Sequence, residues 1–290
     1  MKSFEIGKND ESQRLDKFIH KAAPLLPQSL LYKYIRTKRI KVNGKRAEIS
    51  TRLRLGDKVD MYINDEFFEK KESTYDFLKA SKHLDIIYED DDILVINKKP
   101  DIAMHESHNH RCDALSNAVA FHLMKEGKEC VFRSVGRLDK GTSGIVVCAL
   151  NKFSAAKLSG KIYKEYLAVA GGEFYGDGVI DKPIIRPDPM KTLRDVGVGG
   201  ERAVTHWESL KVKDGCTLLR IHLETGRTHQ IRVHFKSLGA PLVGDDMYGS
   251  TDKRLSHQAL HCCFVRFAHP VTEKIMEFTA PMPDDMNKLT

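Results

Sequence analysis

Several features that would assign this chain of 290 residues to a familiar class are missing from it. The longest apolar stretch, around GIVVCAL, is far too short to span a bilayer. The first residues, MKSFEIGKNDESQ, contain no apolar run of the kind found in signal peptides. Six cysteines occur, but no two of them form a Cys-x-x-Cys pair. We therefore expect a cytoplasmic protein with reduced thiols and no membrane segment.

Sites for common cofactors are also unsupported. No glycine-rich loop ends in lysine followed by serine or threonine, so a nucleoside triphosphate site is not indicated. His105, His108, His110 and Cys112 lie within eight residues and could suggest a transition-metal site. Their spacing matches no ligand set with defensible geometry, and no second cluster completes it. We favour a polar loop that faces RNA, and we expect neither a metal nor a cofactor.

The positive charge is concentrated at one end of the chain. Residues 1–65 carry 15 Lys and Arg against 8 Asp and Glu, whereas the remainder carries 32 of each. The whole formal net charge of +7 therefore lies in the first 65 residues. This distribution is typical of an appended module that binds a polyanion.

The pattern of this module, residues 1–65, predicts a small α/β domain. SQRLDKFIHKAAPLL and QSLLYKYIRTKR predict two helices, and RIKVNGKRAEI predicts a hairpin around Asn43 and Gly44. Over about residues 12–63 this order resembles the small RNA-binding domain named after ribosomal protein S4. A solvated face is the ordinary explanation for interspersed cations, but their concentration here favours contacts with RNA phosphates. The candidate residues are Lys33, Arg36, Lys38, Arg39 and Lys45.

A charge-dense stretch without clear periodicity, residues 66–84, is expected to be a linker to a second domain of residues 85–290. The second domain begins with LDIIYEDDDILVINKKP, which predicts a β-hairpin. DALSNAVAFHLMKEG then predicts a helix. Hairpins, helices and further strands in this order indicate the α+β class.

The tetrapeptide Arg-Leu-Asp-Lys occurs once in each domain. In the first copy Asp16 lies on the polar side of a predicted helix, where an ion pair with Arg14 or Lys17 contributes little. In the second copy Asp139 lies in the glycine-rich loop VGRLDKGTSG, just before an apolar strand. Glycine lets backbone approach a ligand closely, although these residues are equally common in structural turns. Only the second aspartate is a candidate for chemistry.

Two later segments contribute further candidates. KIYKEYLAVAGG places Tyr166 on a strand, where core packing is the ordinary role. LETGRTHQIRVHFKSLG predicts a turn and then a helix from about residue 229 to Leu238, with Leu238 on the buried face. Arg227 and Arg232 lie near its opening turns, where an arginine often pairs with a surface acid.

Together these segments resemble the RluA family of pseudouridine synthases. The family motif His-Arg-Leu-Asp-x-x-Thr-Ser-Gly corresponds to residues 136–144, and Lys-x-Tyr-x-Ala corresponds to residues 164–168. Thr-Gly-Arg-x-His-Gln-Ile-Arg-x-His stands at residues 225–234, and the resemblance covers about residues 85–285. It implies a catalytic domain with a mixed, largely antiparallel sheet flanked by helices. It also implies isomerisation of uridine to pseudouridine in RNA, which gains no atoms and needs no cofactor.

The resemblance also implies roles for individual residues. Asp139 is the expected nucleophile, and whether it attacks the sugar or the base is left open. Because desolvation disfavours a carboxylate, a buried arginine should face it; Arg232 matches the family's arginine, and Arg227 is the alternative. Tyr166 would lie against the uracil ring and could take part in the final proton removal. Arg137 would fill the gap left by a flipped uridine, and Arg227 is a further RNA-binding candidate.

One position departs from the family pattern. Gly136 stands where the family usually has histidine, as glycine does in the related RsuA-type synthases. We expect activity to be retained and the local positioning of RNA to differ. The S4-like module points to large-subunit ribosomal RNA, free or in a precursor subunit, and to a monomer. A transfer RNA synthase and a non-catalytic RNA-binding assembly factor remain the alternatives, and the sequence does not identify the modified uridine.

Overall fold

The computed structural model describes residues 1–7, 10–68, 84–107, 112–128, 132–188 and 191–290. The chain divides into two compact units, Met1–Tyr75 and Asp76–Thr290. Most of the predicted linker, residues 66–84, lies outside the described residues. The same is true of two histidines in the predicted polar loop, His108 and His110.

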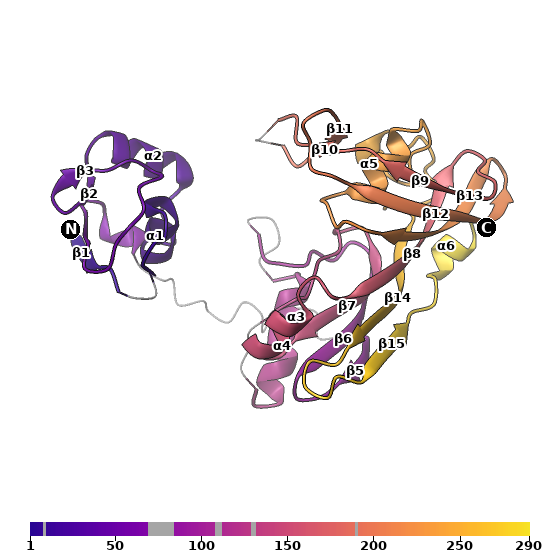
Figure 1. Cartoon of the computed structure of the whole chain (residues 1–290), viewed down its shortest axis with the longest axis horizontal. Coiled ribbons are helices and arrows are strands. Elements are labelled where there is room, and N and C mark those ends of the chain that lie inside the picture. The colour runs from indigo at the N-terminus through magenta and orange to yellow at the C-terminus, as the bar shows by residue number, and fades with distance from the viewer. Residues whose placement is uncertain (8–9, 69–83, 108–111, 129–131, 189–190) are drawn as a thin grey trace. The chain divides into compact units, whose positions relative to one another are not determined.

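The first unit has its own hydrophobic core beneath two short helices and a four-stranded sheet (Figure 1). The sheet order is β1-β4-β2-β3, and a single-turn helix, η2, follows it. Asn43 and Gly44 both have positive φ, 51° and 72°, as a two-residue hairpin turn of the predicted kind requires. The elements are β1 Lys2–Glu5, α1 Leu15–Ala22, α2 Gln28–Arg36, β2 Ile40–Val42, β3 Lys45–Arg46, β4 Lys58–Met61 and η2 Asp65–Phe67.

A nine-stranded sheet forms the centre of the second unit (Figure 1). Its order is β5-β6-β7-β14-β8-β13-β12-β9, and β15 pairs with β14. Strand β7 runs parallel to β14, and the other pairings among the described residues are antiparallel. The strands are β5 Ile86–Glu89, β6 Ile93–Lys98, β7 Ser143–Ala149, β8 Tyr163–Gly171, β9 Asp177–Asp181, β12 Val204–Lys213, β13 Cys216–Leu223, β14 Leu260–Ala268 and β15 Ile275–Thr279. The predicted α+β class with a mixed, largely antiparallel sheet is confirmed.

The remaining elements of the second unit are short helices and a two-stranded sheet. Every residue of β7 is buried, because α3 and neighbouring strands cover this part of the sheet. In Figure 1, α3 and α4 lie beside β6 and β7, and α5 lies near β9 and β12. The elements are α3 Leu115–Lys125, α4 Lys152–Leu158, β10 Ile184–Ile185, β11 Asp195–Val196, α5 Gln230–Lys236, η4 Asp246–Tyr248 and α6 Asp284–Asn287. Among the described residues, no helix is long and apolar enough to cross a membrane.

The predicted helix over residues 229–238 is longer than the observed α5. His229 has a left-handed backbone with φ 59°, so the helix begins only at Gln230. At the other end the chain leaves the helix before Gly239, which has φ 74°. Leu238 therefore lies beyond the helix and is 42% exposed, so its predicted burial is wrong.

Candidate active site

The loop that carries Asp139 is held in place by its packing against the rest of the second unit. Leu138 is buried in the core, and the Thr142 amide donates to the Asp139 carbonyl at 3.1 Å. A Cβ at Gly141 would overlap the Gln258 side chain, and one at Gly144 would overlap the Cys262 backbone. Glycine is needed at both positions because neighbouring atoms of the same chain leave no room for a Cβ. Asp139 is thereby fixed just before β7 with its side chain 20% exposed.

Arg232 connects Asp139 to a second, fully buried carboxylate. Its Nε and Nη2 donate to the two oxygens of Asp245 at 2.7 and 2.8 Å, and its Nη1 donates to Asp139 Oδ2 at 3.2 Å. Burial alone would lower the pKa of Arg232, but the hydrogen bonds and charge of Asp245 raise it. The guanidinium is therefore a permanent cation that Asp245 orients toward Asp139.

Tyr166 reaches the same place from the middle of the sheet. It lies on β8, paired with Ile221 of β13 and Cys262 of β14, and it is 7% exposed. Burial raises the pKa of the Tyr166 hydroxyl well above its usual range, and a hydrogen bond with the Cys262 thiol adds to this. At neutral pH the side chain is therefore a protonated phenol.

These side chains enclose a pocket and adjoin a larger cleft. The pocket has a volume of about 60 Å³, and the cleft of about 680 Å³ reaches Asp139 from its other side. The structure thus brings together Asp139, Tyr166 and Arg232 from a loop, a strand and a helix. The pocket lining includes Arg137, Asp139, Tyr166, Leu223, His229 and Arg232.

The two arginines proposed to contact RNA have different surroundings. Arg137 is exposed and donates a hydrogen bond to the Thr228 hydroxyl at the pocket. Arg227 forms an ion pair with Glu201 at 2.7 Å and donates to the Arg202 carbonyl at 3.1 Å. Arg227 therefore does not serve as the ion-pair partner of Asp139, the role considered for it as an alternative to Arg232.

His229 also faces the nucleophile candidate, although the sequence pattern did not single it out. The Tyr248 hydroxyl accepts the Arg194 amide at 3.1 Å and lies 2.8 Å from His229 Nδ1. If the hydroxyl donates to Nδ1, the imidazole proton is on Nε2, which lies 3.9 Å from Asp139 Oδ2. Burial lowers the pKa of His229, so the ring is predominantly neutral at neutral pH. A left-handed backbone at a residue with a side chain is strained and is common at functional sites.

Lys98 is a buried lysine that supports the loop carrying Asp139. It lies at the end of β6 and is 1% exposed. Its ammonium donates to the carbonyls of Lys99, Ile102 and Lys140, each at 2.9 Å, so all its donors are used. Lys140 follows Asp139 directly, and this contact ties the catalytic loop to the neighbouring strand. Burial lowers the pKa of Lys98 to about 7.

This pKa makes the stability of the fold depend on pH. The unfolded lysine, with a pKa of 10.5, binds a proton that the folded lysine begins to release above pH 7. Stability should therefore rise with pH from 7 to 9, with a limiting slope of about 1.4 kcal/mol per pH unit. Denaturant unfolding of the full chain and of Lys98→Met at pH 7, 8 and 9 would measure this. The variant should lack this rise, and equal slopes would contradict the assignment.

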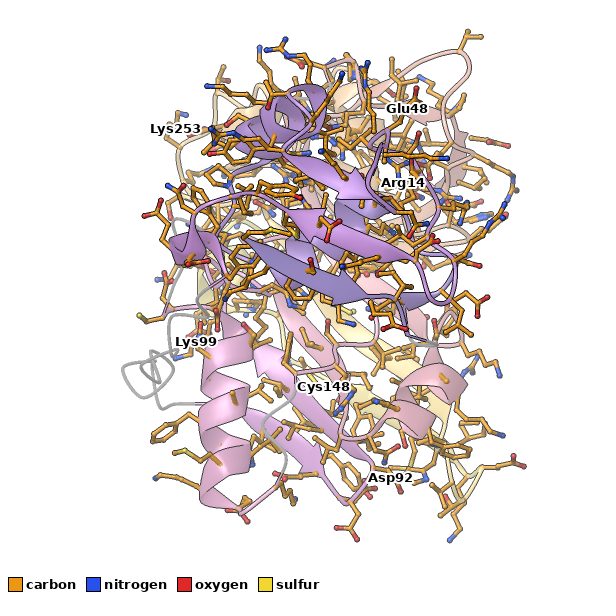
Figure 2. The ribbon with its side chains drawn as sticks, turned by 90° about the vertical axis from the view of Figure 1, so that its left-hand side faces the viewer. Arg14, Glu48, Asp92, Lys99, Cys148 and Lys253 are labelled. Carbon is orange, nitrogen blue, oxygen red and sulfur yellow. The ribbon has the colours of Figure 1, made fainter. Side chains whose placement is uncertain are left out.

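One group of described residues has the spacing of metal ligands, Asp90, Asp92 and His269. Asp92, labelled in Figure 2, lies at the turn between β5 and β6. Asp90 accepts the amides of Asp92 and Ile93 at 2.8 Å and the His269 Nε2 proton at 3.0 Å. These contacts account for the cluster as a structural cap of the turn.

The cations proposed to contact RNA in the first unit are at its surface. The five residues Lys33, Arg36, Lys38, Arg39 and Lys45 are all exposed. Asp16, in the first Arg-Leu-Asp-Lys copy, forms the predicted ion pair with Arg14 at 2.9 Å. Both side chains are partly exposed, so the pair contributes little to stability.

Comparison with known proteins gives consistent matches along the chain. Residues 92–237 match the family model described as RNA pseudouridylate synthase, and residues 13–59 match the S4 domain. The uncharacterized RNA pseudouridine synthase YhcT of Bacillus subtilis is 38% identical over 259 residues, covering 86% of this chain and 83% of that protein. The ribosomal large subunit pseudouridine synthase D of Haemophilus influenzae is 34% identical over 307 residues, covering 99% and 93%.

A solved structure gives a further match. Human RNA pseudouridylate synthase domain containing 1 superposes with a TM-score of 0.57 at 27% sequence identity. The match covers 69% of this chain and 84% of the human chain.

Proposed function

The chain belongs to the RNA pseudouridylate synthase family and carries an S4 domain, and from this premise we propose that Asp139, Tyr166 and Arg232 isomerise a uridine of large-subunit ribosomal RNA. One observation carries the proposal. Asp139 faces a pocket and receives a hydrogen bond from a buried arginine whose Nε and Nη2 donate to Asp245. A retired site would have no reason to keep this arrangement, which disfavours a non-catalytic assembly factor.

The reaction moves the ribose from nitrogen 1 to carbon 5 of the uracil ring, so substrate and product are isomers. The Asp139 carboxylate assists departure of the base by attacking the substrate or by stabilising positive charge on the sugar. The Arg232 guanidinium donates to this carboxylate at 3.2 Å and places a positive charge beside it. Since Asp245 holds one edge of the guanidinium through two hydrogen bonds, the guanidinium need not reorganise during the reaction.

Tyr166 is suited to pack against the uracil ring. Its protonated phenol does not act as a base at neutral pH in the free protein. Removal of the proton from carbon 5 by this oxygen therefore requires the bound RNA to change its surroundings. His229 Nε2, 3.9 Å from Asp139, is a further group within reach of the substrate.

The small pocket alone does not hold a uridine. Its volume of about 60 Å³ is well below that of ligand sites, which are roughly 300 Å³ or more. The hydrogen bond between Arg137 and Thr228 lies at this pocket and is exposed, so breaking it costs little. Arg137 is then free to occupy the gap that the flipped uridine leaves in the RNA.

The substrate class rests on the S4 domain and on the relatives. Several relatives that match nearly the whole chain are named ribosomal large subunit pseudouridine synthase D. Exposed cations of the first unit would bind phosphates, which position an RNA without reading its sequence. A monomer acting in the cytoplasm on free ribosomal RNA or a precursor subunit fits these features.

Mapping of pseudouridines tests this proposal directly. The full chain is incubated with large-subunit ribosomal RNA transcript or with transfer RNA, and products are mapped by carbodiimide-blocked primer extension. We expect a new stop in the ribosomal transcript. A stop in transfer RNA alone would change the substrate, and inactivity on both RNAs and on precursor subunits would favour a binding protein.

Removal of residues 1–65 should weaken RNA binding and its dependence on salt. Each lost phosphate contact should reduce the slope of log Kd against log salt by roughly 0.7 to 0.9. The two units have separate hydrophobic cores, so the second should fold without the first. Filter binding at several salt concentrations measures the slope, and circular dichroism checks the fold. Unchanged affinity and slope would contradict a role of the basic domain in binding.

A further inference from the structure

A second cavity lies directly beside the catalytic pocket. It has a volume of about 460 Å³, within the range of sites that hold a small ligand. It shares Arg137, Tyr166 and Leu223 with the catalytic pocket, so the two spaces adjoin along one wall. Its other walls come from the loop before Asp139, from the residues around the start of β8 and from the turn after β13.

Gly136 leaves this cavity open on the side of the catalytic loop. Its φ of 82° is a conformation that residues with a side chain rarely adopt. A Cβ at this position would lie 3.0 Å from the Lys164 ammonium, so any side chain would begin in contact with it. The shape of the cavity on this side therefore depends on glycine at position 136.

Lys164 gives the cavity an uncompensated positive charge. Alternation along β8 puts Lys164 on the same face as Tyr166. Its side chain is half-buried, and in the described part of the chain its ammonium has no ion-pair partner. Glu224 also lines the cavity, but its oxygens are held by Arg202 and His206, both at 2.8 Å. A partly desolvated cation of this kind gains most from binding an anion.

Tyr163 lies at the rim of the cavity, but its ring belongs to the other face of the sheet. Alternation along β8 puts Tyr163 on the same face as Glu165, and its hydroxyl donates to Glu165 at 2.9 Å. The Arg266 guanidinium lies 5.1 Å from the centroid of this ring. On the face of Tyr166, the charged side chain that β8 directs toward the cavity is therefore Lys164.

We propose that this cavity binds the nucleotide next to the target uridine in the RNA chain, with its phosphate on Lys164. This inference rests on the proposed function, because the shared wall allows one RNA strand to fill both spaces. Gly136 then provides the room that this neighbouring nucleotide occupies.

Replacement of Lys164 by methionine in the full chain tests the phosphate contact. We expect KM for the ribosomal transcript to rise about tenfold, because a charge-assisted hydrogen bond is lost, while kcat changes less than about twofold. Lys164→Arg should retain most of the affinity and shows that the site tolerates substitution. The matched control is Lys161→Met, an exposed lysine of the same segment that does not line the cavity. Equal effects of Lys161→Met and Lys164→Met would overturn the proposal.

A scan of the RNA backbone then identifies the contact. Hairpin oligonucleotides around the mapped uridine each carry one neutral methylphosphonate linkage. One linkage beside the uridine should lower kcat/KM of the wild type about tenfold and that of Lys164→Met less than twofold. Equal losses in the wild type and in Lys164→Met would overturn the proposal, whereas a wild type that makes no pseudouridine would contradict the proposed function instead.

Discussion

Asp139→Asn should abolish pseudouridine formation while leaving RNA binding within about twofold of the wild type. The amide cannot act as a nucleophile or stabilise positive charge, and we expect a loss on the order of 10⁴-fold, as for other essential nucleophiles. The fold should survive, because Arg232 keeps both of its contacts with Asp245. Single-turnover assays on the ribosomal transcript measure the rate, and filter binding measures the affinity.

The chain supplies its own matched control for this experiment. Asp16 lies in an identical Arg-Leu-Asp-Lys tetrapeptide and forms an ion pair with Arg14 on the surface of α1. Asp16→Asn should leave kcat unchanged and alter stability by less than about 0.5 kcal/mol. Near-normal turnover in Asp139→Asn would refute its assignment as the nucleophile, and complete loss in Asp16→Asn would contradict the separation of the two domains.

The contrast between the two copies of the tetrapeptide explains why several residues of the candidate site could be predicted from the sequence. The first copy of the tetrapeptide lies at the start of a helix, because apolar residues recur at helical spacing around Asp16. Glycine and short polar residues around Asp139 produce a loop. Periodicity and turn composition report local structure, and motif order identifies the family. Asp139, Tyr166 and Arg232 were candidates for this reason.

The contacts that support those residues could not be predicted in the same way. Asp245 meets Arg232 through a turn, and Lys98 reaches the Lys140 carbonyl 42 positions further along the chain. No local pattern connects such pairs, because they depend on how strands are ordered in the sheet. The position of His229 was missed for a different reason. Helical periodicity does not reveal that one residue at the start of a helix has a left-handed backbone.

The S4-like domain and the catalytic domain differ in how their functional residues depend on the fold. The exposed cations proposed to contact RNA would act through charge, which the sequence states directly. Asp139 and Arg232 would act through their placement and orientation, which exist only in the folded chain. This difference explains why a count of charges was enough to predict an RNA-binding module. The structure was needed to show that Arg232, and not Arg227, contacts Asp139.

Arg232→Met should reduce both stability and activity more than any other single change outside Asp139. Asp245 has a side chain only 1% exposed, and the substitution leaves its carboxylate buried without a counter-charge. Breaking a buried pair in this way costs about 3 kcal/mol or more of unfolding free energy. Asp139 also loses its cation, so kcat should fall by about 10² to 10³-fold. Urea unfolding and single-turnover rates measure the two effects.

A second substitution separates these two effects. Arg232→Met combined with Asp245→Leu replaces both charges by apolar side chains and should restore most of the stability. It should restore no activity, because Asp139 still lacks its arginine. Arg227→Met is the control, since its ion pair with Glu201 is exposed at 40% and 69% and should contribute less than about 0.5 kcal/mol. Recovery of turnover in the double variant would show that Arg232 serves stability alone, and the proposed electrostatic support of Asp139 would then be wrong.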